Sequence, residues 1–86
     1  MTGSEQKILD AFLVDTDCEL SGAELLKRTR LSSGSLYPAL LDLEEAGWVS
    51  SRWKEVLPQA LPRRRLYRLT RRGMRGALHV IQGLPA

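Results

Sequence analysis

Residues 21–47 read SGAELLKRTRLSSGSLYPALLDLEEAG and contain two helix signals in close succession. Ser21 and Glu24 form a capping box, in which each side chain accepts a hydrogen bond from the other residue's backbone N–H. A helix is therefore expected to begin at Gly22. We expect it to be short, because a second set of helix-start residues follows a turn at about 29–32.

The second helix of this stretch is expected over 33–45. Three leucines at helical spacing form its apolar face: Leu36, Leu40 and Leu43. Gly47 follows as the left-handed residue that commonly ends a helix. Pro38 lacks a backbone N–H and crowds the carbonyl four residues before it, so the opening turns should be irregular or tightened. Two helices joined by so short a turn indicate a helix-turn-helix.

A further helix is expected before this pair, over about 4–14. Its apolar residues recur at helical spacing: Ile8, Leu9, Phe12 and Leu13. Residues 15–19 then read as a polar connector, and Leu20 and Leu25 supply a hydrophobic staple for the next helix.

Beyond Gly47 the sequence pattern changes to alternation, which is typical of strands. Strands are expected over 49–56 and 63–69, joined by a loop at 57–62 that contains two prolines. Thr70 is expected to cap a last helix over 71–82. The order predicts an α+β, mostly α fold: a winged helix-turn-helix with three helices, a two-stranded wing and a short C-terminal helix.

Charge is divided unequally along the chain. The first 46 residues hold four basic and nine acidic side chains, whereas the remainder holds nine basic side chains against Glu55 alone. Eight of those nine are arginine, whose planar group suits phosphates and guanine edges. This segregation indicates a polyanionic partner, of which nucleic acid is the commonest.

Three segments carry a family resemblance: SLYPAL at 35–40, LEEAGWV at 43–49 and RRLYRLT at 64–70. In these the chain resembles the PadR-like bacterial transcriptional regulators. The resemblance implies a winged helix, a homodimer and binding to palindromic operator DNA, usually as a repressor and often at its own promoter. Two features depart from the family: the long C-terminal helix is shortened to 71–82, and Leu20-Ser21-Gly22 replaces a Tyr-Gly pair.

The candidate DNA contacts lie at the start of the second helix of the pair and on the wing. Small hydroxyl residues there allow a close approach to phosphates or base edges, and a basic strand can follow the backbone. The predicted set is Arg30, Ser32, Ser33, Ser35, Tyr37, Arg63, Arg64 and Arg65. The alternatives are that the serines only cap the helix, that Tyr37 packs in the core, and that the arginines are a solvated strand edge.

The tryptophans, the cysteine, the histidine and the acidic patch are expected to have structural rather than functional roles. Trp48 and Trp53 are expected in the core rather than as a stacking platform for nucleic acid. Cys18 is expected to be an ordinary thiol, and His79 a surface or interface residue rather than a metal ligand. The acidic patch Asp42, Glu44 and Glu45 is expected to be solvated or to pair with Arg52.

The sequence contains no glycine-rich phosphate loop and no nucleophile motif, and we expect neither enzymatic activity nor a cofactor. No apolar run reaches the roughly 18 residues that span a bilayer, so a cytoplasmic protein is expected.

We expect one domain over 1–86 that dimerises through its first and last helices, because the core is small and Leu78, Val80, Ile81 and Leu84 are otherwise unneeded. The leading hypothesis is that the protein is a transcriptional regulator that binds double-stranded DNA in a sequence-specific manner. The alternatives are a protein-interaction module and a plasmid or phage factor that coats DNA.

Overall fold

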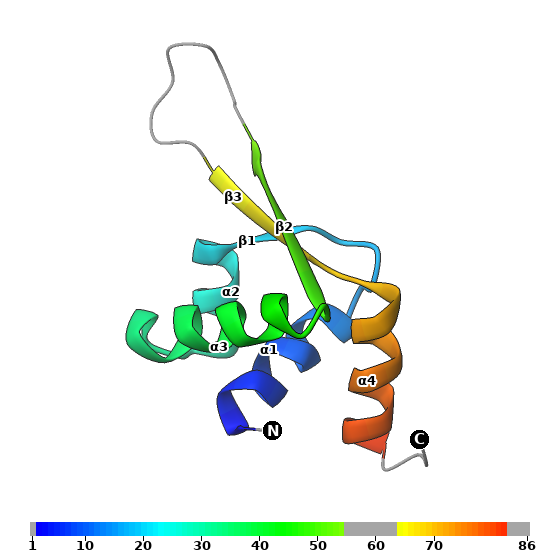
Figure 1. The fold of residues 1–86 in the computed structure, drawn as a ribbon. Helices are drawn as coiled ribbons and strands as arrows, with labels where there is room; N and C mark the ends of the chain where they lie inside the picture. The colour runs from blue at the N-terminus through cyan, green and yellow to red at the C-terminus, as the bar shows by residue number, and fades with distance from the viewer. Residues whose placement is uncertain (1, 55–63, 83–86) are drawn as a thin grey trace.

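The computed structural model describes residues 2–54 and 64–82 and has the predicted order of elements with one short strand added (Figure 1). The elements are α1 (Gly3–Leu13), β1 (Leu20–Ser21), α2 (Gly22–Thr29), α3 (Ser33–Glu45), β2 (Val49–Lys54), β3 (Arg64–Leu69) and α4 (Arg71–Gln82). The predicted α+β, mostly helical winged fold is confirmed. In the part of the chain described, no helix has the length and apolar character needed to cross a membrane.

The helix ends follow the local signals of the sequence. Ser21 Oγ accepts the Glu24 N–H and Glu24 Oε1 accepts the Ser21 N–H, both at 3.2 Å, so the predicted capping box opens α2. Gly47 ends α3 at φ 79°, and the Trp48 N–H donates to the Leu43 carbonyl at 2.9 Å. This is a Schellman motif, which satisfies carbonyls that the helix end would otherwise leave without partners.

The start of α3 takes the tightened form, one of the two expected alternatives, and is not irregular. Its first turn is tightened, because the N–H groups of Ser35 and Leu36 both donate to the Ser32 carbonyl, at 3.1 and 2.9 Å. The rest is α-helical, with Pro38 inside the helix and exposed. A proline this near a helix start removes only the bond to the carbonyl of Gly34, which explains why the helix continues through it.

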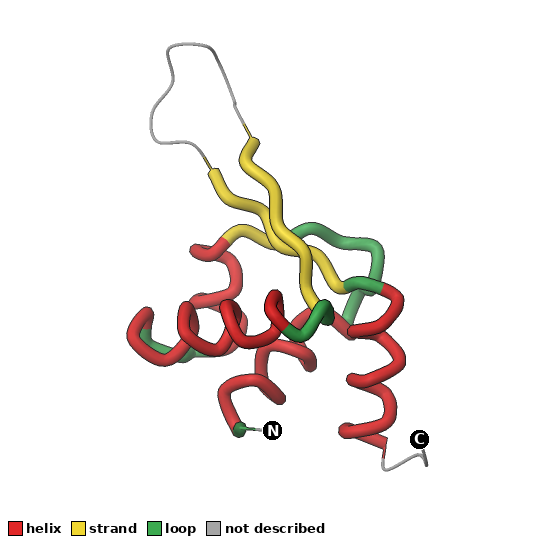
Figure 2. The backbone as a smooth tube through the Cα atoms, in the orientation of Figure 1, coloured by secondary structure: helices red, strands yellow, loops and turns green. Residues whose placement is uncertain are grey.

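The sheet has the order β1-β3-β2, and both pairings are antiparallel. β1 was not predicted; its residues Leu20 and Ser21 pair with Tyr67 and Leu66 of β3. Two residues are too few to show the alternation that identifies a strand, and only β3 provides the pairing. In Figure 2 the β2–β3 hairpin extends beyond the helices as a wing.

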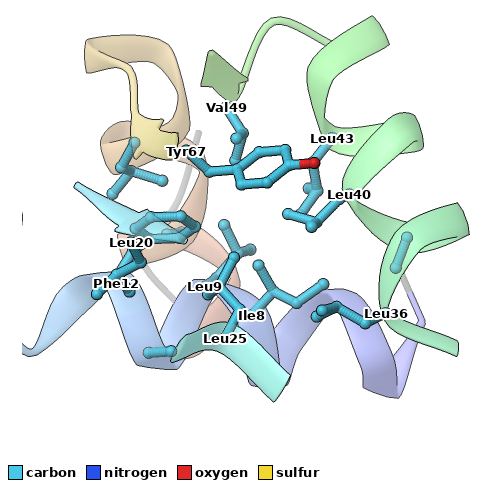
Figure 3. Packing of buried hydrophobic residues seen from close by; sticks show 14 residues of the cluster. Ile8, Leu9, Phe12, Leu20, Leu25, Leu36, Leu40, Leu43, Val49 and Tyr67 are labelled. Atoms are coloured by element: carbon cyan, nitrogen blue, oxygen red, sulfur yellow. The ribbon is translucent and has the colours of Figure 1, made fainter. Parts of the chain in front are cut away.

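The core lies between the helices and the inner face of the sheet. Its largest fully buried side chains are Phe12, Ile8, Leu9, Leu20, Leu25, Leu36 and Leu40. Figure 3 shows the ring of Tyr67, from β3, beside Leu43 and Val49. The base of the wing is thus attached to α3 through buried apolar contacts. Each contact stabilises the fold in proportion to the apolar area that it removes from water.

α4 joins the end of α3 through Thr70 and Trp48. The Thr70 hydroxyl donates to the Gly47 carbonyl at 2.7 Å and accepts the Gly73 N–H at 2.9 Å, as expected of a cap. Trp48 is half-buried against the core, and a side chain at Gly73 would overlap its carbonyl while one at Gly76 would overlap its indole. These two glycines therefore allow α4 to pack closely on the residue that follows α3.

Candidate nucleic-acid interface

The start of α3 presents exposed hydroxyl groups. Ser32, Ser33 and Ser35 are all exposed, and Ser32 makes no side-chain cap hydrogen bond to the helix. Its hydroxyl instead donates to Ser35 Oγ at 3.3 Å. The alternative interpretation, that these serines only cap the helix, is therefore weakened for Ser32. Hydroxyls and backbone N–H groups at such a helix start are suited to phosphates and base edges.

Tyr37 lies one turn further along α3 and is 43% exposed, so its side chain is not part of the buried core. Its hydroxyl lies against Gly22 at the start of α2, where a Cβ would come within 2.5 Å of it. Gly22 thus allows the Tyr37 side chain to lie close against the start of α2 while it stays partly exposed. This placement fits the predicted contact with DNA better than the alternative of a core residue.

Arg30 occupies the turn between α2 and α3 in a left-handed conformation, φ 60° and ψ 20°. Its N–H donates to the Leu26 carbonyl at 2.9 Å, which ends α2, and its side chain is exposed. Glycine or asparagine is the usual residue in this conformation because a Cβ makes it costly. An arginine here places a cation immediately before the exposed start of α3.

The predicted wing arginines do not share one environment. Arg63 lies outside the described residues. Arg64 is exposed and stands opposite Lys54 at the outer end of the described hairpin. Arg65 points to the other face of the sheet and is held by side chains of β2 and α3 through Ser51 and Glu44.

Trp53 is 56% exposed, so the prediction that it belongs to the core is wrong. It shares a strand face with buried Val49, but β2 extends past the helices and its burial is lost along its length. The Arg65 guanidinium lies 5.4 Å from the centroid of the Trp53 ring. Only the base of the wing covers the core, so alternation alone could not identify the buried positions.

A cleft of about 330 Å³ separates the wing from the start of α2 and from α3. Its lining is aromatic and cationic: Tyr37, Trp53, Tyr67, Arg64 and Arg65, together with Ser21, Gly22 and Ala23. Burial raises the pKa of Tyr67, and the nearby Arg65 partly opposes that effect. The cleft therefore brings together Tyr37, Arg64 and Arg65 of the predicted set. The serines at the start of α3 do not line it, and Ser35 lines a separate hollow between α3 and α1.

Of the two alternatives expected for the acidic patch, exposure to solvent is confirmed for Asp42 and Glu45, whereas the ion pair with Arg52 is wrong. Arg52 Nε and Nη2 donate to the two oxygens of Glu19, both at 2.7 Å, whereas Glu44 receives Arg65 at 3.3 Å. Successive residues of a strand point to opposite faces, so Arg52 faces away from α3 while Ser51 faces towards it. The hydrogen bonds from Arg52 lower the pKa of Glu19.

Positive charge is absent from α3 itself, which contains three acids and no lysine or arginine. Exposed cations of the described residues lie on other elements instead. They include Arg30 before the helix, Arg64 and Arg68 on β3, and Arg71 and Arg72 at the start of α4.

The described residues include no cluster of side chains that could form a metal site, and Cys18 and His79 do not line the cleft. Among residues 2–54 and 64–82, no group of three or more His, Cys, Asp or Glu side chains could hold a metal ion. Cys18 is half-buried, and its thiol donates to the Glu19 carbonyl at 3.5 Å. His79 is half-buried on α4, and its Nδ1 is enclosed without a hydrogen-bond partner in the described structure.

Known structures share this architecture. Smu.1704 from Streptococcus mutans UA159 is 24% identical with a TM-score of 0.75, over 93% of this chain and 74% of that one. A transcriptional regulator from Clostridium thermocellum is 23% identical with a TM-score of 0.75, over 93% of this chain and 78% of that one. A PadR-like transcription factor from Bacteroides fragilis is 26% identical with a TM-score of 0.73, over 92% and 77% of the two chains.

The comparison with curated proteins found no match. The model of the transcriptional regulator PadR-like family matches residues 21–78, a segment that includes α2, α3, both strands of the wing and most of α4. The chain therefore belongs to the PadR-like family of transcriptional regulators, which are not enzymes.

Proposed function

We propose that this regulator is a sequence-specific repressor that binds a palindromic operator as a homodimer and acts on its own promoter. The start of α3 enters the major groove. The observation that carries this proposal is the exposed start of α3, where Ser33 and Ser35 are accessible and Ser32 provides no side-chain cap. In helix-turn-helix proteins this end of the second helix faces the base edges.

Base reading and phosphate binding are assigned to different elements. Because α3 has no cationic side chain, Ser33, Ser35 and Tyr37 approach the bases through hydroxyl groups and an aromatic edge. Arg30, in the turn before α3, and Arg64, which lines the cleft with Tyr37, bind the phosphates, whose contacts supply most of the salt-dependent affinity. Arg63, in the same basic run of the wing, is assigned to phosphate binding as well.

The homodimer is proposed to form through α1 and α4. α4 packs against α1 within the chain, and Leu78 and Val80 on α4 are only half-buried. A second copy would bury these side chains and enlarge a core that is small for an independent domain. Two-fold symmetry of such a dimer matches a palindromic operator, since each half-site meets the same surface.

The first experiment measures binding to DNA from upstream of the protein's own gene by fluorescence anisotropy, against a scrambled duplex of the same composition. Ser35→Ala and Tyr37→Ala should each weaken binding to the upstream duplex by about fivefold, the loss of one hydrogen bond. Ser50→Ala is the matched control, because Ser50 is exposed on the sheet face that points away from α3.

Urea unfolding of each variant separates binding from folding. Loss of roughly 3 kcal/mol of stability in Tyr37→Ala would assign Tyr37 to the core rather than to the DNA surface. Equal affinity for all duplexes with evenly repeated footprints would indicate a DNA-coating factor, and no binding to DNA would indicate a protein-interaction module. Sedimentation as a monomer at tens of micromolar would contradict the dimer.

A further inference from the structure

Arg65 is part of a closed set of hydrogen bonds that joins three elements. Its Nε and Nη2 donate to Ser51 Oγ of β2 at 3.0 and 2.9 Å, and Nη2 also donates to Glu44 Oε2 of α3 at 3.3 Å. Ser51 Oγ in turn donates to the same Glu44 oxygen at 3.1 Å. β2, β3 and α3 are therefore connected through one guanidinium group.

The same guanidinium also lies over two aromatic rings. It lies 5.4 Å from the centroid of the Trp53 ring and 5.8 Å from that of Tyr67, within the range of cation–π contacts. A planar group can donate along its edge and stack on its faces at once, which the compact ammonium of lysine cannot do. The surroundings of residue 65 thus select arginine specifically rather than positive charge alone.

Arg64 provides the contrast within the same strand. Alternation along β3 directs it to the opposite face of the sheet, although its atoms also line the cleft, and it lies opposite another cation, Lys54. Glu44, by comparison, is only 22% exposed at its side chain and supplies Arg65 with a counter-charge. Both arginines are exposed, but Arg65, 41% exposed at its side chain, is also bonded to Ser51 and Glu44.

We propose that Arg65 is a positioning residue, which fixes the angle between the wing and α3 through Glu44, and not one of the phosphate contacts. The proposal rests on the proposed function, in which the wing and α3 bind the same duplex. Both elements reach their groups on DNA only if the offset between them is fixed, so this connection affects discrimination between sequences more than general affinity.

The experiment compares Arg65→Gln and Glu44→Gln with the control Arg64→Gln. The probes are a duplex that the wild-type protein selects from a random library and a scrambled duplex of the same composition. Arg65→Gln should weaken binding to the selected duplex roughly tenfold, with little effect on the scrambled duplex or on the slope of log K against log salt. Arg64→Gln should weaken both duplexes and reduce that slope by about 0.9.

Glu44→Gln gives the sharpest distinction. If Arg65 acts through Glu44, this variant also weakens binding to the selected duplex, and the double variant loses no more than either single variant. If Arg65 binds phosphate, removal of a nearby acid strengthens binding to both duplexes and Arg65→Gln reduces the salt slope, which would overturn the proposal. Arg65→Lys should not restore discrimination in the positioning role, whereas lysine would retain most of a simple phosphate contact.

The free protein supplies a readout that does not depend on DNA. The Arg65 Nε–H, held by Ser51, should give a slowly exchanging NMR signal in the wild type that is lost in Glu44→Gln. Urea unfolding verifies that each variant is folded. We expect little loss of stability, because the ion pair between Arg65 and Glu44 is partly exposed. If the wild type selects no sequence, the proposed function fails, but an Nε–H signal unchanged by Glu44→Gln would by itself contradict the role of Arg65.

Discussion

Replacement of Gly73 by alanine should destabilise the protein although Gly73 lies inside a helix. Helix propensity alone favours alanine by about 1 kcal/mol. A Cβ at Gly73, however, would overlap the carbonyl oxygen of Trp48 and lie 2.9 Å from Leu69 Cδ1. That carbonyl is backbone and also accepts the Thr70 N–H at 3.0 Å, so it cannot move without loss of the contact between β3 and α3.

The expected magnitude follows from these two opposing effects. Overpacking against atoms that cannot move costs about 3 kcal/mol, and the gain in propensity offsets about 1 kcal/mol of it. A net loss of about 2 kcal/mol lowers the melting temperature of a domain of this size by about 8–16 °C. Urea and thermal unfolding followed by circular dichroism, at one fixed protein concentration, measure both quantities.

Two further glycines serve as controls. At Gly34, near the start of α3, a Cβ meets nothing within 4 Å, so Gly34→Ala should be neutral or stabilising by about 0.5 kcal/mol. At Gly76 the overlap is with the indole of Trp48. Trp48→Leu should therefore relieve Gly76→Ala but not Gly73→Ala. A Gly73→Ala protein as stable as the wild type would refute the packing of α4 on the end of α3.

Three other substitutions test the charges and the backbone. Arg30→Gly should stabilise the fold by about 0.5–1 kcal/mol by removing a left-handed non-glycine residue, while anisotropy shows weaker DNA binding and a salt slope lower by about 0.9. Burial raises the pKa of Tyr67 above its ordinary value of 10.0. The neutral Tyr67 side chain therefore contributes fully to the free energy of unfolding below pH 10.0, and this contribution is lost as pH rises through the folded pKa. Tyr67→Phe should therefore flatten the alkaline part of the stability profile, and an unchanged profile would contradict this. The pKa of Glu19 is lowered from 4.5, so the pair with Arg52 stabilises at neutral pH and is lost as pH falls through the folded value. Unfolding of Glu19→Gln between neutral and acid pH should show a shallower dependence than the wild type.

The order of the elements and most helix ends follow from the sequence alone, because their signals are local. Ser21 with Glu24, Gly47 and Thr70 each act on backbone groups within a few residues, and each functions in the structure as its type predicts. The placement of the serines at the start of α3 also follows, since the helix begins at the expected residue. The sequence therefore determines where the candidate recognition surface begins.

The tertiary structure decided which side chains of the wing are covered and what they contact. Alternation along β2 and β3 shows which residues share a face but not how far the strands extend beyond the core, so Trp53 was assigned to the wrong environment. The two-residue strand β1 exists only because β3 lies beside it. Alternation places Arg64 and Arg65 on opposite faces of the sheet, but only the packing shows that Arg65 meets Glu44. Their difference arises from the position of α3 relative to the sheet, a contact between residues far apart in the chain.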